Sequence, residues 1–451
     1  MKKQLSLLLL AVSFYTCAAQ PLPKPAPRQL EWQQMETTAF LHFTVNTFTD
    51  KEWGDGTESP SIFNPVDFDA KKIVRILKET GFRQVIITAK HHDGFCLWPS
   101  KYTSHSVKSS PWKNGKGDVV REIADACREY GVKFGFYLSP WDRHEPSYGT
   151  AAYNAYYKNQ LRELLTNYGE VYEVWFDGAK GKDAKDMEYD FKGYWQMVRE
   201  LQPKAVLFSD AGPDVRWVGN EKGFAGLTCW STINASSVGI GKAGQEKYLN
   251  EGDPNGTDWV AAEADVSIRK GWFYHAKEDS TVRTGQALAD LYYRSVGRNS
   301  LLLLNIPPNP KGLLGAQDVK SLVDFRNILD ETFKLNLASG KADKKLVDEQ
   351  LGTYVTLNDK EPITIDFKQP VSFDRAMFQE NIADGQRNEE ALLEYWDGAA
   401  WQKIEQFTTI GYKRLLRFPL VKTTRVRFTV LKAKQPVQLA AIGFYKASGK
   451  E

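Results

Sequence analysis

Two adjacent histidines are the first residues whose types and spacing suggest chemistry. His91 and His92 precede Asp93-Gly94, and the 451-residue chain has only six histidines. Such a pair could bind a metal ion, transfer protons, hydrogen bond to a substrate or serve structure alone. Adjacent side chains on a strand point to opposite faces, and no second histidine cluster or paired cysteines supply further metal ligands. We therefore expect hydrogen bonding rather than a metal site, and no cofactor.

An aspartate that ends an apolar run is the second candidate. In VYEVWFDG (171–178), Asp177 directly follows Trp175-Phe176 and precedes a glycine. An Asp in this place could cap a helix or close a turn, or it could project a carboxylate into a cleft. In sugar cleavage one carboxylate attacks the anomeric carbon and another group protonates the leaving oxygen. Asp177 is the candidate for the attacking carboxylate.

Two downstream segments offer the group that would protonate the leaving oxygen. DVRWVGNE (214–221) ends with Glu221, and EADVSIRKGW (263–272) begins with Glu263. A carboxyl group in an aromatic-lined site can hold its proton near neutral pH. Glu221 is the preferred acid, and the second segment offers Glu263, Asp265 and Arg269 as a rival set, with Glu263 as the alternative acid.

Alternating strand-like and helical patterns must position these residues. Helical patterns such as 67–82, 118–131, 151–169 and 191–203 lie between apolar runs at 37–43, 84–90, 132–140, 171–177, 204–210 and 300–308. Most of these runs lack a period of two, which suits parallel strands buried on both faces. The alternation predicts an α/β fold, a TIM-like (β/α) barrel with its working residues at the carboxyl ends of the strands. The remaining strands are not located between residues 211 and 299, and 236–258 reads as a long loop.

The pattern of apolar and polar residues changes near residue 336. Short, mostly alternating runs such as YVTLN, ITIDF and RVRFTV are separated by turn residues. That pattern is typical of an antiparallel β-sandwich. We predict a barrel domain over residues 20–335 and a C-terminal β-sandwich domain over 336–451.

The N-terminus predicts export. Lys2 and Lys3 precede an apolar run and the small residues Cys17-Ala18-Ala19. This order is typical of a signal peptide over residues 1–19, and FYT before Cys17 is a poor lipidation signal. No other apolar run approaches the length of a membrane span. We expect an exported periplasmic or extracellular protein, with a lipid anchor at Cys17 as the weaker alternative.

The composition indicates which classes of molecule the protein binds. The net charge is only +3, from 59 basic and 56 acidic residues, which gives no case for nucleic acid. Aromatic residues make up 13% of the chain. Aromatic faces pack against the apolar faces of sugars, so this content favours a carbohydrate partner.

The motifs together resemble a known family. FLHF, KEW, KHHDGF, FYLSPW, VWFDG, DVRWVGNE and SIRKGWFYH occur in this order over residues 30–330. The set is similar to glycoside hydrolase family 29, the exo-acting α-L-fucosidases. The forms VRWVGNE and RKGWFYH look like the bacterial branch that acts on α1,3/1,4-linked fucose in Lewis-type oligosaccharides.

The resemblance implies a retaining, two-step mechanism without metal on a fucosylated oligosaccharide or glycan. Asp177 matches the nucleophile and Glu221 the acid/base, while Glu263 remains a rival acid or a further substrate contact. The positions that match the surroundings of the fucose ring are His42, Glu52, Trp53, His91, His92, Tyr137, Arg216 and Trp272. A cationic Arg216 would hold the nearby carboxylate ionised. The oligomeric state stays open.

Three alternatives differ from this reading. The chain could be a non-catalytic sugar-binding barrel, or a glycosidase for another α-linked sugar. A metal-dependent hydrolase built around His91 and His92 is the third.

Overall fold

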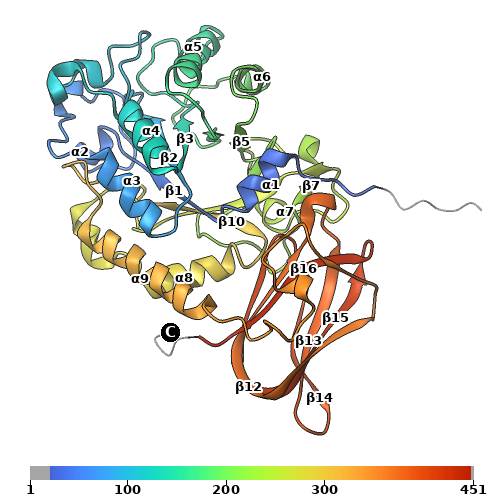
Figure 1. Cartoon of the computed structure of the whole chain (residues 1–451). Coiled ribbons are helices and arrows are strands. Elements are labelled where there is room, and N and C mark those ends of the chain that lie inside the picture. The colour runs from blue at the N-terminus through green and yellow to red at the C-terminus, as the bar shows by residue number, and fades with distance from the viewer. Residues whose placement is uncertain (1–20, 448–451) are drawn as a thin grey trace, which may run out of the picture.

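Eight parallel strands form a closed barrel in the computed structural model, which describes residues 21–447 (Figure 1). The predicted signal peptide at 1–19 lies outside the described residues. The order around the barrel is β1-β10-β9-β6-β5-β4-β3-β2. The strands are β1 (Thr37–Leu41), β2 (Gln84–Lys90), β3 (Lys133–Leu138), β4 (Glu173–Trp175), β5 (Val206–Ser209), β6 (Val215–Trp217), β9 (Ala261–Ser267) and β10 (Ser300–Asn305). The predicted barrel is confirmed.

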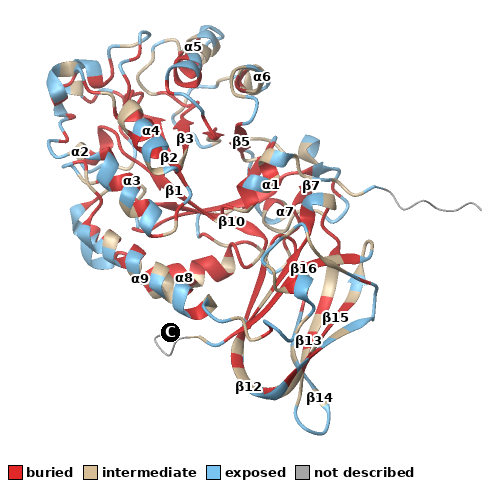
Figure 2. Ribbon diagram, in the orientation of Figure 1, coloured by how far each residue is buried: buried red, intermediate tan, exposed pale blue. Residues whose placement is uncertain are grey.

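Helices surround most of this barrel. They are α3 (Ala70–Glu79), α4 (Val119–Tyr130), α5 (Ala152–Asn167), α6 (Phe191–Leu201), α8 (Gly285–Arg294) and α9 (Ala316–Phe333). Asp69 and Asp118 cap α3 and α4 by accepting backbone N–H bonds, which fixes where each helix begins. In Figure 2 the strands are buried and the helices expose only their outer faces, so the main core lies between the two layers.

A short helix closes the amino end of the barrel. Trp32, on α1 (Pro27–Gln33), is fully buried among inward-facing strand residues such as Phe40. Its indole donates to Glu173 Oε2 at 3.0 Å. The floor of the barrel is therefore packed, and access is left to the carboxyl ends of the strands.

The C-terminal part is a six-stranded antiparallel sheet of order β11-β16-β12-β15-β13-β14. Its strands are β11 (Val355–Leu357), β12 (Pro362–Glu380), β13 (Asn388–Trp396), β14 (Trp401–Phe407), β15 (Arg414–Ala433) and β16 (Val437–Tyr445). The predicted antiparallel β-domain is confirmed, but its strands are hydrogen bonded as one sheet rather than two. Bulges interrupt the long pair β12·β15, and one apolar core gathers residues from both halves of β12. Backbone pairing with this sheet starts soon after α9, where Leu337 N–H donates to Phe444 O at 2.9 Å.

The sheet domain packs on the side of the barrel where the helical layer is thinnest. Between β6 and β9 the only α-helix is the six-residue α7 (Glu246–Glu251). The segment 225–231 covers the outer face of these strands, and the sheet domain holds it by its backbone. Arg414 donates to Leu227 O at 2.9 Å, and Cys229 N–H donates to Thr409 Oγ1 at 3.0 Å.

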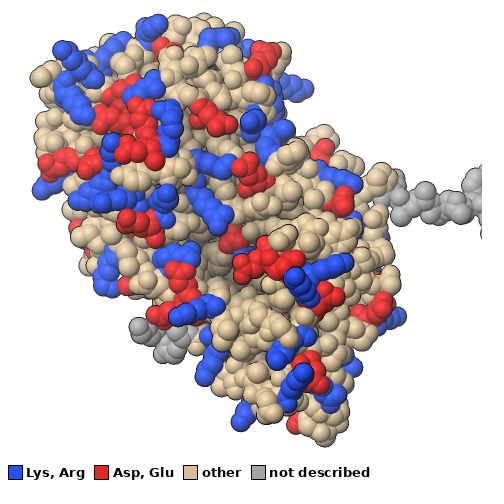
Figure 3. All heavy atoms as spheres, viewed as in Figure 1, with Lys and Arg blue, Asp and Glu red and all other residues tan. Residues whose placement is uncertain are grey.

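The structure supplies the strands that the sequence left unplaced in the middle of the chain, and it corrects one prediction there. β6 and β9 lie inside the stretch where no strand was located, and residues 236–258 contain α7 rather than only a loop. Within residues 21–447, no helix has the length and apolar character needed to cross a bilayer. On the face shown in Figure 3, basic and acidic side chains are interspersed.

Candidate active site

Asp177 follows β4 at the carboxyl end of the barrel. Its side chain keeps 19% of its surface exposed, so a substrate can reach it. Tyr137 donates its hydroxyl to Oδ2 at 2.9 Å, and the N–H of Ala179 donates to Oδ1 at 2.8 Å. Burial raises the pKa of Asp177 to about 7; the two hydrogen bonds oppose this rise, and the charges of Asp210 and Glu221 add to it. The carboxylate is thus held in place, partly exposed and close to a second carboxyl group.

Three histidine rings cluster beside Asp177. The ring centroids of His42 and His91 are 5.5 Å apart, and those of His91 and His92 are 4.1 Å apart. His92 Nε2 lies 3.7 Å from Asp177 Oδ2. β2 ends at Lys90, so His91 and His92 occupy the turn that follows it. The expectation that adjacent side chains point apart does not apply here, because neither residue is on the strand.

The hydrogen-bond partners of two histidines fix their protonation. His42 Nδ1 lies 2.8 Å from the carbonyl oxygen Oδ1 of Asn305, which can only accept. His92 Nδ1 lies 2.7 Å from Ser139 Oγ, whose hydroxyl already donates to Trp141 O at 2.5 Å. Nδ1 therefore carries the proton in both rings, and Nε2 is left as an acceptor.

Burial keeps all three rings neutral. It lowers the pKa of His42 and of His92 to about 3 and lowers the pKa of His91 well below its ordinary value. The buried His91 Nδ1 has no hydrogen-bond partner among the described residues. These nitrogens can therefore bind hydroxyl groups without adding positive charge.

Two tryptophans stand next to the histidines. Trp53 is 46% exposed and contacts His92 edge-on, with ring centroids 5.6 Å apart. The ring of Trp272 lies 5.1 Å from that of His42. Both can offer apolar surface to a ligand that is hydrogen bonded to the histidines.

Glu52 holds the segment that carries Trp272. Its carboxylate accepts from the backbone N–H groups of Trp272 and Phe273 at 2.7 and 3.1 Å. His275 Nε2 lies 2.6 Å from the same carboxylate, and His275 Nδ1 pairs with Asp50. Burial lowers the pKa of His275, but the bonds to Asp50 and Glu52 outweigh it and raise the pKa overall. Glu52 is thus placed to orient Trp272.

Glu221 faces the same cluster from the turn after β6. It is exposed to solvent, yet the atoms packed around its carboxyl raise its pKa. A hydrogen bond from the Trp272 side chain opposes this rise, and the charge of Glu52 adds to it. Since the charge of Glu221 also raises the pKa of Asp177, the two carboxyl groups interact.

The predicted contact between Arg216 and a catalytic carboxylate is wrong. Val215 and Trp217 pack inside the barrel, so the alternation along β6 directs Arg216 outward. Arg216 is fully buried there. Its guanidinium donates to three backbone carbonyls, those of Leu249, Trp230 and Val260.

Glu263 does not reach the site either. It lies on β9 inside the barrel and is 0% exposed. Trp175 donates its indole N–H to Glu263 Oε1 at 2.8 Å. Burial and the neighbouring Glu173 raise the pKa of Glu263 well above its ordinary value. Without access to solvent it can neither contact a substrate nor serve as its acid, so both predicted roles are wrong.

Two further residues belong to the site: Asp265, which is part of the rival set that the sequence offers, and Asn305, which was not predicted. Asp265, one inward position further along β9, accepts from the Trp217 indole at 2.9 Å. Burial raises the pKa of Asp265 well above its ordinary value, and the charge of Glu221 adds to this rise. Asn305, the last residue of β10, accepts a hydrogen bond from His42 Nδ1 and donates to Trp272 O at 2.7 Å. Asn305 could have been found as the polar residue that interrupts the apolar run 301–308.

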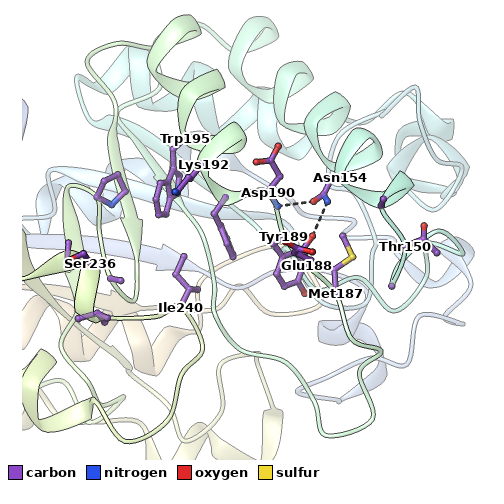
Figure 4. Close-up of a pocket in the computed structure, with 17 residues that line it drawn as sticks. Thr150, Asn154, Met187, Glu188, Tyr189, Asp190, Lys192, Trp195, Ser236 and Ile240 are labelled. Carbon is purple, nitrogen blue, oxygen red and sulfur yellow. Dashed lines mark hydrogen bonds between the residues drawn. The ribbon is translucent and has the colours of Figure 1, made fainter.

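A separate pocket of about 1050 Å³ lies between the N-terminal ends of α5 and α6 and the segment 235–240 (Figure 4). Asn154 shapes its wall by donating to Glu188 O at 3.0 Å and accepting from Asp190 N–H at 3.1 Å. None of the predicted site residues lines this pocket. We therefore place the chemistry at the Asp177 cluster.

No grouping of three or more His, Cys, Asp and Glu side chains within residues 21–447 is arranged to hold a metal ion. Among the described residues, Cys96, Cys127 and Cys229 are buried free thiols.

Comparison with known proteins places this geometry in a family. The family model described as alpha-L-fucosidase matches residues 19–331. The chain is 48% identical to Alpha-L-fucosidase 1 of Arabidopsis thaliana over 446 residues, covering 94% of this chain and 88% of the relative.

Solved structures agree with this match. A glycoside hydrolase 29 family member from an unknown rumen bacterium is 44% identical, with a TM-score of 0.88 over 96% of this chain and 79% of that one. A Ruminococcus gnavus GH29 fucosidase in complex with fucose is 36% identical, with a TM-score of 0.87 over 96% and 97% of the two chains. The chain therefore belongs to the α-L-fucosidase family, glycoside hydrolase family 29.

Proposed function

We propose that this α-L-fucosidase acts from the non-reducing end of its substrate and retains the anomeric configuration, with Asp177 as nucleophile and Glu221 as acid/base. The observation that carries the proposal is a carboxylate, Asp177, partly exposed at the end of β4 and near enough to Glu221 for the charge of Glu221 to raise its pKa. The fucose complex of the Ruminococcus gnavus relative supports fucose as the sugar bound here.

The reaction has two displacements. Asp177 attacks the anomeric carbon as the bond to the leaving oxygen breaks, and Glu221 gives that oxygen its proton. Water then attacks the anomeric carbon of the fucosyl-enzyme and gives a proton to Glu221, and the Asp177 carboxylate departs. Each carboxyl group returns to its starting state.

The histidines supply recognition. His42 and His92 each offer an unprotonated Nε2, which accepts a hydrogen bond from a sugar hydroxyl. His91 Nδ1 provides a further unpaired site. The exposed face of Trp53 suits the apolar edge of a 6-deoxy sugar, and a sugar with an additional hydroxyl there would lose about 1 to 3 kcal/mol.

The linkage is proposed as α1,3 or α1,4, as in Lewis-type oligosaccharides, because of the forms VRWVGNE and RKGWFYH in the sequence. Hydrolysis of a panel of α1,2-, α1,3-, α1,4- and α1,6-linked fucosides tests this directly. Equal rates on all four would contradict the assignment.

We also propose export, and N-terminal sequencing of the mature protein from the native host should find cleavage after Ala19.

The nucleophile is tested by Asp177→Ala. We expect kcat/KM for an aryl α-L-fucoside to fall by at least about 10⁴-fold, because the covalent route is lost. Asp183→Ala is the control, since Asp183 lies in the same loop, is 66% exposed and pairs with Arg143. Comparable activity in the two variants would refute the role of Asp177, and binding of fucose without turnover by the unmodified protein would indicate a sugar-binding barrel instead.

A further inference from the structure

Glu221 lies in a tight turn with defined internal contacts. Gly219 begins the turn with a φ of +82°. Asn220 Oδ1 accepts from Lys222 N–H at 3.0 Å, and Asn220 Nδ2 donates to Phe224 O at 3.0 Å. The segment 219–224 is called the acid turn below.

A single side chain from elsewhere in the chain joins the two ends of the acid turn. Asn250 Nδ2 donates to Val218 O at 2.9 Å and to Phe224 O at 3.1 Å. Both hydrogens of one amide are therefore used to fix the separation of the strand that enters the turn and the segment that leaves it. Glu221 lies between these two points.

The acid turn also rests directly on the helix that carries Asn250. A Cβ at Gly219 would lie 2.3 Å from Glu246 O, at the first residue of α7, so only glycine permits this approach. The turn and α7 are thus in backbone contact as well as joined by Asn250.

Arg216 anchors α7 from the other side. It donates to Leu249 O at 2.9 Å and to Trp230 O at 2.8 Å, and the N–H of Trp230 donates to Glu251 O at 2.8 Å. Leu249 itself is 1% exposed. α7 is therefore a fixed support, although it contains only six residues.

We propose that Asn250 is the positioning residue for Glu221, holding the acid turn so that the carboxyl group meets the leaving oxygen. The inference rests on the proposed role of Glu221 as acid/base. A general acid must lie within hydrogen-bond reach of the atom that it protonates, and small displacements cost much of its effect. Loss of the Asn250 bridge should therefore impair proton donation and leave the attack by Asp177 intact.

Two substrates separate these effects. One is a fucosylated oligosaccharide, whose leaving group needs a proton, and the other is dinitrophenyl α-L-fucoside, whose leaving group needs none. For Asn250→Ala and for the near-isosteric Asn250→Asp, we expect kcat/KM to fall about 100-fold on the oligosaccharide and less than about threefold on the dinitrophenyl substrate. Azide should accelerate turnover of the latter in both variants, as it should in Glu221→Ala, because it replaces the water that the acid/base activates.

Lys247→Ala is the matched control. Lys247 is on the same helix, its side chain is 87% exposed, and its ion pair is to Glu251 at 3.6 Å. It should leave both rates unchanged, and thermal unfolding of all variants checks that each is folded at the assay temperature.

Each other outcome has a distinct meaning. Equal losses on both substrates, or no loss, in the Asn250 variants would overturn the positioning role while Glu221→Ala remains selective. If Glu221→Ala itself lost activity equally on both substrates, the proposed acid would be wrong, and this inference would fail with it.

Discussion

The hydroxyl of Tyr137 offers a direct test of how the site sets the ionisation of its nucleophile. It donates to Asp177 Oδ2 at 2.9 Å and so stabilises the charged carboxylate. This bond opposes the effect of burial, which raises the pKa of Asp177 to about 7 with the bond in place. Tyr137→Phe removes this donor and should raise the pKa of Asp177. A hydrogen bond to a charged group contributes about 1.5 to 3 kcal/mol, and one pKa unit corresponds to about 1.4 kcal/mol. Because the protonated acid can still bond to a hydroxyl, we expect the lower end, a rise of about one unit.

The assay must isolate Asp177 from the acid. In a Glu221→Gln background, with dinitrophenyl α-L-fucoside, kcat/KM depends on ionisation of the nucleophile and not on protonation of Glu221. It should increase with pH through the pKa of Asp177. Adding Tyr137→Phe should move this rise about one unit higher, which costs about tenfold at pH values below both pKa values and little above them.

The control for this shift is Tyr168→Phe in the same background. Tyr168 is also buried and also donates to a carboxylate, Asp118 Oδ2 at 3.0 Å, outside the cluster around Asp177. It should leave the pH profile unchanged. Superimposable profiles with and without the Tyr137 hydroxyl, or a shift to lower pH, would refute the reasoning.

Three further predictions concern the surroundings of the site. Glu52→Ala should raise KM about tenfold, because it releases the backbone of Trp272. Asp55→Ala is the control, since it removes an exposed carboxylate nearby and should leave KM unchanged. An unchanged KM in both variants would contradict the orienting role of Glu52. Because its partners raise the pKa of His275 above 6.5, its contribution to stability is present below that value and is lost as pH rises through the raised pKa. Urea unfolding of wild type and His275→Gln should therefore differ more at about pH 5.5 than at about pH 9, and a constant difference would exclude a charged His275. Exhaustive dialysis against EDTA should leave kcat/KM unchanged, because the proposed steps use only carboxyl groups; loss of activity restored by a divalent ion would instead favour the metal-dependent alternative.

The barrel could be predicted where its strands have apolar side chains on both faces. The run 84–90 coincides with β2, and Asp69 and Asp118 mark the starts of α3 and α4. β9 was missed because Glu263 and Asp265 alternate with small apolar residues, a pattern that does not resemble a strand buried on both faces. A carboxyl group inside a barrel costs free energy unless it has hydrogen-bond partners, and only the folded structure brings those partners together.

The residue types of the candidate site could be predicted, but the directions in which their side chains point could not. The place of Asp177 after a strand is visible in the sequence. Whether Arg216 faces the cleft depends on the start of β6, a strand of only three residues, and a shift by one residue reverses the face. The bridge from Asn250 to Val218 and Phe224 spans up to 32 residues and leaves no periodic signal.

The grip of the sheet domain on segment 225–231 has a consequence for how homologous sequences can diverge. Arg414 donates to the carbonyl oxygen of Leu227, and the side chains of Thr409 and Gln386 accept from the backbone N–H groups of Cys229 and Ser231. A substitution at an exposed position such as Leu227, which is 71% exposed, therefore leaves the grip intact, whereas the buried Ala225 and Cys229 also pack against the barrel strands. The three residues of the sheet domain are constrained by the side-chain bonds that they make, whereas an exposed residue of the segment is constrained only by the path of its backbone.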